Sequence, residues 1–127
     1  MAGVDYRQLA EQAIEWFHRA QKLDPWNAYA YLGEGWCLDW TDRKVDSAVC
    51  FDRAEQLDPN GYFTMASVGL HYVEIGNFAA AKSWFERSLR LQATENPIAR
   101  DYLEITQRRL MEAATNDLSA RLSPSQH

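Results

Sequence analysis

Residues 75–92, with the sequence IGNFAAAKSWFERSLRLQ, contain the pattern that decides the fold. Phe85, Arg87 and Leu91 in this stretch each recur at intervals of 34 residues toward the amino terminus. The earlier copies of these columns are Phe51 and Phe17, Arg53 and Arg19, and Leu57 and Leu23. Small residues repeat at the same interval in two more columns, which are Ala13, Ser47 and Ala81, and Ala20, Ala54 and Ser88. A fixed period of this length indicates stacked copies of one structural unit.

Each copy is predicted to be an antiparallel pair of helices. Its first small residue, its phenylalanine and its next small residue follow at spacings of four and three, which places them on one helix face. The first two copies end in Leu-Asp-Pro, and proline cannot continue a helix interior. A second helical pattern then contains Gly35 or Gly69. A glycine inside a helix costs about 1 kcal/mol relative to alanine, so we expect another helix backbone to pass close to both glycines.

The apolar pattern and its breaks predict an all-α chain. The helices are expected at 5–22, 27–40, 44–57, 61–74, 78–92 and 98–115. The last of them should cap the end of the stack, with a packing face formed by Ile98, Tyr102, Ile105 and Leu110.

The repeat resembles the tetratricopeptide-repeat family, most clearly in residues 75–81 with Trp84 and Phe85, and the likeness covers about residues 8 to 95. It implies a helical-hairpin solenoid with a C-terminal capping helix over residues 5–115. The expected divisions are a half repeat at 5–26, repeats at 27–60 and 61–94, a capping helix at 97–115 and a disordered tail at 116–127. Two departures are visible, because the turn at 41–44 lacks the usual glycine and Ala93 stands where proline is usual.

In this family the first helix of each hairpin lines a concave surface that holds a protein or peptide. Carried over by offset from the matching glycines, this surface would contain Tyr29, Leu32, Trp36, Asp39, Trp40, Phe63, Ala66, Leu70, Val73 and Glu74. The set is mostly aromatic and aliphatic, so it predicts a hydrophobic groove for a peptide. The alternative for any one of these side chains is packing between neighbouring helices.

The residues of this surface give less support to two other kinds of ligand, a terminal carboxylate and a sugar. One branch of the family grips a terminal carboxylate with basic and asparagine side chains, but Gly33 and Ser67 stand where asparagine is expected, and no basic clamp is present. Stacking of Trp26, Trp36 or Trp40 on sugar rings stays open as an alternative.

Charge and composition argue against several other classes. The net charge of −5 is the wrong sign for binding phosphates, so we do not expect a nucleic-acid partner. No apolar run is long enough to cross a bilayer, and we expect a soluble chain, cytoplasmic by default. Cys37 and Cys50 lie in apolar helical patterns and are predicted to be reduced core residues.

Catalysis has little support in the sequence. The histidines are scattered, and none lies at metal-ligand spacing with another ligand, so no metal or other cofactor is expected. His71 is predicted to be hydrogen-bonded and packed in a helix. Six carboxylates are predicted to lie on solvated helix faces, namely Asp5, Glu11, Glu15, Glu34, Glu55 and Glu86. The sequence therefore predicts a binding module, not an enzyme.

The first helix has no hairpin partner within the repeat pattern. An uncovered apolar stripe at the end of a solenoid is normally sealed by a polar cap, by more chain or by a second subunit. We expect Leu9, Ala13 and Phe17 to lie on this edge, where a homodimer could form.

A second and looser resemblance concerns residues 37–40, 57–62 and 84–89, which are similar to repeat modules of bacterial membrane polymerases and ligases of surface polysaccharides. It implies, as the alternative function, the non-catalytic soluble end of such an assembly.

Overall fold

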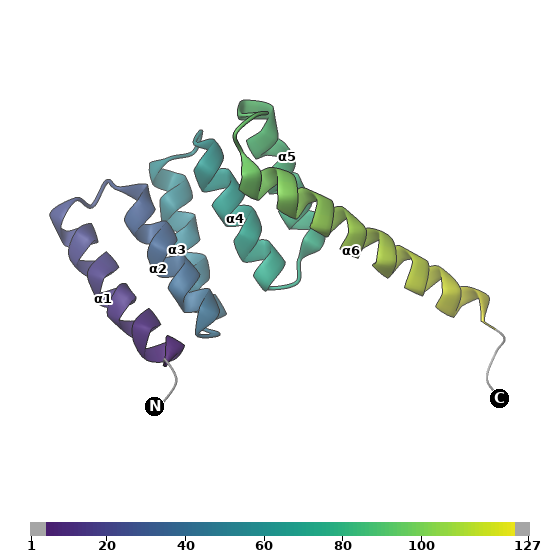
Figure 1. The fold of residues 1–127 in the computed structure, drawn as a ribbon, viewed down its shortest axis with the longest axis horizontal. Coiled ribbons are helices and arrows are strands. Elements are labelled where there is room, and N and C mark those ends of the chain that lie inside the picture. The colour runs from purple at the N-terminus through teal and green to yellow at the C-terminus, as the bar shows by residue number, and fades with distance from the viewer. Residues whose placement is uncertain (1–4, 124–127) are drawn as a thin grey trace.

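A computed structural model describes residues 5–123 of the chain, and this part is entirely helical, without β-strands. The helices are α1 (Tyr6–Leu23), α2 (Ala28–Trp40), α3 (Lys44–Leu57), α4 (Tyr62–Glu74), α5 (Phe78–Leu91) and α6 (Pro97–Leu122). Consecutive helices run in opposite directions and form a curved row from α1 to α6 (Figure 1). The all-α hairpin solenoid expected from the repeat is confirmed.

Short polar residues fix where several helices begin. The carboxylate of Asp5 accepts hydrogen bonds from the backbone N–H groups of Arg7 and Gln8 at the start of α1. Asn27 and Asn77 cap α2 and α5 in the same way. Such caps satisfy amide groups that have no partner within the helix. The first turn of α6 contains Pro97, whose fixed φ angle suits that position.

The core consists of three clusters that follow one another along the row. One lies between α1, α2 and α3, the next between α2, α3 and α4, and the last between α4, α5 and α6. The three repeated phenylalanines belong to successive clusters, and Phe51 and Phe85 are almost completely buried. Helix α4 also contacts α2 on one flank and α6 on the other, so these three helices form one side of the solenoid.

The glycine that recurs as Gly35 and Gly69 has a different reason from the one expected. A Cβ atom on Gly35 would lie 2.7 Å from the ring of Phe51, and one on Gly69 would lie 2.5 Å from the ring of Phe85. The close neighbour is therefore a phenylalanine side chain of the next helix, not a helix backbone. Each glycine provides the space that the ring of its own hairpin fills.

The last helix also differs from its prediction. It extends to Leu122 instead of ending near 115, while residues 124–127 lie outside the described part. Its buried residues are Ala99 and Thr106, whereas Tyr102 and Ile105 are 37% and 41% exposed. The face of α6 that packs on the stack therefore differs from the predicted one. The prediction followed the large apolar residues, whereas the buried positions are a small alanine and a threonine, which allow close approach to α5 but are only weakly hydrophobic. Beyond residue 110 all described side chains of α6 are exposed, and the helix projects from the stack (Figure 1).

Candidate binding groove

A groove of about 660 Å³ runs across the side formed by α2, α4 and α6. Its lining residues are Ala13, Phe17, Tyr29, Leu32, Gly33, Trp36, Cys37, Asp39, Trp40, Phe63, Leu70, Glu74, Ile98 and Tyr102. All the residues predicted for the concave surface are among them except Ala66 and Val73. Ala66 is completely buried in the core cluster between α4, α5 and α6, and the partly buried Val73 packs against the same cluster.

Aromatic rings from two helices form the middle of the groove. Trp36 of α2 meets Phe63 of α4 edge to face, with ring centroids 6.0 Å apart. Tyr29 tilts onto the same phenylalanine at 5.6 Å. Trp36 is half-buried, whereas Tyr29 and Trp40 are 59% and 77% exposed and project from the groove wall. Contacts of this geometry hold the rings in place, so the apolar surface of the groove is already ordered before a ligand binds.

Two helices that the sequence prediction did not assign to the groove also line it. Ile98 and Tyr102 of α6 line it, because α6 occupies the place of the first helix of a further repeat. The register breaks at 93–97, so carrying positions over by offset could not find them. Ala13 and Phe17 of α1 also line it and pack against the first core cluster.

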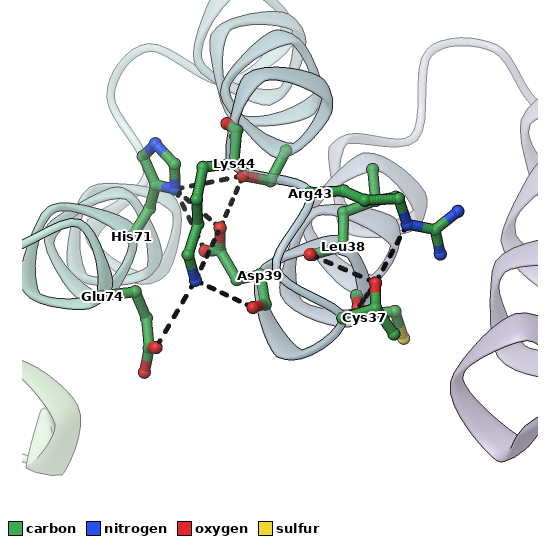
Figure 2. Close-up of polar contacts among 9 residues, drawn as sticks. Cys37, Leu38, Asp39, Arg43, Lys44, His71 and Glu74 are labelled. Carbon is green, nitrogen blue, oxygen red and sulfur yellow. Dashed lines mark hydrogen bonds and ion pairs between the residues drawn. The ribbon is translucent and has the colours of Figure 1, made fainter. Parts of the chain in front are cut away.

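The carboxylates of the groove lie at one end, close to a lysine. Asp39 and Glu74 are the acidic lining residues, and the ammonium group of Lys44 lies 3.8 Å from Glu74 Oε2 and 3.9 Å from Asp39 Oδ1. The same group donates a hydrogen bond to the backbone oxygen of Asp39 at 2.8 Å. Figure 2 shows the lysine between the two carboxylates. Glu74 remains half exposed, so this end of the groove is acidic.

Asp39 also anchors a buried network that joins α2, α3 and α4. It accepts hydrogen bonds from Ser47 Oγ at 2.5 Å and from His71 Nδ1 at 3.0 Å. The imidazole of His71 stacks on Phe51, with centroids 4.8 Å apart. The hydrogen-bonded packing role predicted for His71 is confirmed. Aspartate and serine both face Nδ1, whereas a catalytic triad needs the serine at Nε2.

A second buried network surrounds Glu34, whose side chain was wrongly predicted to be solvated. Its carboxylate accepts hydrogen bonds from Gln21 at 3.3 Å and from Cys50 Sγ at 2.9 Å, and it also meets His18 Nε2. Helices α1, α2 and α3 thus share one carboxylate. The position of Glu34 within α2 could not predict its burial, because its hydrogen-bonding partners come from two other helices.

Both cysteines are buried with free thiols, as predicted. Burial is the main cause that raises the pKa of Cys37 above its usual range, and the charge of Glu34 adds to this. The pKa of Cys50 is raised for the same first reason, and its hydrogen bond to Glu34 contributes further. Neither thiol is activated as a nucleophile, since the thiolate is the reactive form.

The described residues contain no cluster of histidine, cysteine or carboxylate side chains that could hold a metal ion. Within residues 5–123, no helix is long and apolar enough to cross a membrane. Trp26 lies in the connection between α1 and α2 and does not line the groove, so the three tryptophans considered for sugar stacking do not form one platform.

No family model matches the chain, but comparison with known proteins finds a distant relative. This chain resembles part of a yeast protein. Superkiller protein 3 of Saccharomyces cerevisiae is 26% identical over 110 residues, which cover 85% of this chain. The chain spans only 8% of the length of that relative. The likeness to modules of bacterial polysaccharide enzymes remains a prediction.

Proposed function

We propose that this chain is a non-catalytic binding module that holds a peptide or protein segment in the aromatic groove. The observation that carries the proposal is the convergence of Tyr29, Trp36, Trp40 and Phe63 on one continuous hollow. Exposed aromatic side chains that line a preformed hollow are the usual anchors of protein recognition. The similarity to a segment of a much longer yeast protein is compatible with a module of this kind.

The charges at the groove suggest which segments fit best. The ligand would place aliphatic or aromatic side chains between α2 and α4, over the ring pair of Trp36 and Phe63. A lysine or arginine at one end would approach Glu74, which is half exposed. Lys44 offsets part of the charge of the two nearby carboxylates, so the expected preference is for one basic residue, not for a long basic run.

The test uses random peptides displayed on phage and selected against the whole chain. We expect the enriched peptides to share apolar anchors beside a lysine or arginine. Synthetic copies of these peptides should bind at least about tenfold more weakly to Tyr29→Ala and Trp40→Ala, because both side chains are exposed groove residues. Glu74→Gln should weaken the basic peptides and leave the affinity of neutral ones unchanged.

The matched control is Trp26→Ala, which removes an equally exposed tryptophan that does not line the groove. Its affinities should equal those of the unchanged chain. If no peptide family is enriched, or if the selected peptides bind Trp40→Ala and Trp26→Ala equally well, the groove is not the binding site.

A further inference from the structure

The outer face of α1 carries an apolar stripe that runs from its first residue to its last. Its members are Tyr6, Leu9, Ala13, Trp16, Ala20 and Leu23, which follow at alternating spacings of three and four. This spacing places them along one seam, as in a two-stranded coiled coil. Tyr6, Trp16 and Leu23 are 76%, 68% and 88% exposed, which is unusual for such large apolar side chains.

At the positions equivalent to Ala13, Trp16 and Ala20, the other repeats are covered by the first helix of their own hairpin. Trp16 corresponds to Cys50, which is buried and bonded to Glu34 of α2. It also corresponds to Trp84, which packs against the cluster containing Val68 of α4. The same difference in burial holds for the positions of Ala13 and Ala20. Both alanines are only half-buried in α1. Their counterparts are completely buried, namely Ser47, Ala81, Ala54 and Ser88.

Phe17 does not belong to this open face, although the sequence placed it there. Its ring meets Gly33 of α2, and Ala10 and Ile14 of α1 are buried in the same contact between the two helices. The free face therefore contains Leu9 and Trp16 but not Phe17, and the half-buried Ala13 lies at its border with the groove. Arg19 lies over the Trp16 ring, 5.7 Å from its centroid, and borders this face.

We infer that this face pairs with the same face of a second copy of the chain, with the two α1 helices antiparallel. When the two stripes overlap along their full length, Tyr6 would meet the partner's Leu23, Leu9 the partner's Ala20, and Ala13 the partner's Trp16. The two inner pairs, Leu9 with Ala20 and Trp16 with Ala13, then each place a large side chain against a small one. A parallel pair would instead oppose Trp16 with the partner's Trp16 and alanine with alanine. The stripe is thus self-complementary in the antiparallel sense that a two-fold axis requires.

The charged border agrees with this arrangement. On the free side of the seam Gln12 would lie beside the partner's Arg19, so no like charges face each other there. The covering helix would also run antiparallel to α1, as α2 does to α3 and α4 does to α5. The second copy would take the position that the first helix of a hairpin takes in the other repeats. This inference does not depend on the proposed groove function.

Light scattering after size exclusion, on the 127-residue chain at rising concentration, tests the inference. We expect a dimer. Trp16→Glu should raise its dissociation constant at least about tenfold, because the charge would be buried twice in one interface. Val49→Glu is the control, since Val49 is equally exposed but lies on α3. A monomer at all concentrations, or equal effects of the two substitutions, would overturn the inference.

A mixing experiment tests the antiparallel register. Leu9→Glu and Ala20→Lys should each be monomeric alone, with circular dichroism spectra that show an intact fold. A mixture should form a heterodimer in which the new glutamate meets the new lysine and the second Leu9–Ala20 layer stays intact. If the variants associate no better mixed than separate, the antiparallel register is wrong.

Discussion

The ring of Phe17 in α1 lies so close to Gly33 in α2 that a Cβ atom on Gly33 would be 2.2 Å from the Cζ atom of the ring. This is closer than the approach of Phe51 to Gly35 or of Phe85 to Gly69. The pair draws α1 and α2 together beside the groove, which both residues line. The position of α1 therefore depends on the absence of one methyl group.

Gly33→Ala should destabilise the chain although alanine is the better helix former. The helical preference alone would add about 1 kcal/mol of stability. The overlap with the half-buried, closely packed ring of Phe17 outweighs this gain, and we expect the free energy of unfolding to fall by about 1–3 kcal/mol. Urea unfolding followed by circular dichroism measures the change.

The double variant Phe17→Leu/Gly33→Ala isolates the cause. Leucine lacks the Cε and Cζ atoms that approach Gly33 most closely, so alanine should cost much less in that background. Equal effects of Gly33→Ala in the two backgrounds would show that the ring is not responsible.

The repeat made the fold predictable, because Phe17, Phe51 and Phe85 recur together with their small neighbours. The reason for each glycine was harder to predict. Close approach depends on which side chain of the facing helix points at the glycine, and offsets within one helix do not reveal it. Gly33 was compared with asparagine in other groove sequences, whereas its neighbour in space is a phenylalanine from the preceding helix.

The groove followed from the sequence as far as the period held. Tyr29, Trp36 and Phe63 line the hollow at the positions that the repeat offset gives them, because they belong to intact repeats, while their role in binding stays a prediction. Tyr102 was missed because α6 follows a connection with a broken register. Glu34 was misjudged because its hydrogen-bonding partners, Cys50 among them, become neighbours only when three helices pack together.

Asp39→Ala should strongly destabilise the chain. The Asp39 side chain is almost fully buried and accepts hydrogen bonds from Ser47 and His71, so its loss leaves polar groups without a partner in the core. Breaking a buried pair of this kind costs about 3 kcal/mol. Asp52→Ala on the exposed face of α3 is the control and should change stability by less than about 0.5 kcal/mol. A loss for Asp39→Ala as small as that of the control would rule out a stabilising network.

The buried thiols predict a loss of stability in alkaline solution. The pKa values of Cys37 and Cys50 are raised above the ordinary 9.0, so the folded chain keeps protons that the unfolded chain releases. Their contribution is complete below pH 9.0 and declines above it. The free energy of unfolding should fall by about 1 kcal/mol per pH unit for each thiol. The variant Cys37→Ala/Cys50→Ala removes both groups and should show a flatter decline, and an unchanged slope would contradict this origin.

Thr106→Val should stabilise the contact between α6 and α5. Thr106 is completely buried, and its hydroxyl has no hydrogen-bond partner among the described residues. Valine keeps the shape and removes a polar group whose burial without a partner costs about 1–3 kcal/mol. We expect a rise in the free energy of unfolding of about 1 kcal/mol, measured by urea titration. Thr115→Val is the control, because Thr115 is exposed on the same helix and should give a change of less than about 0.5 kcal/mol. A decrease for Thr106→Val would mean that the hydroxyl is hydrogen-bonded in solution, for example by a buried water molecule, and that this helix contact is partly polar.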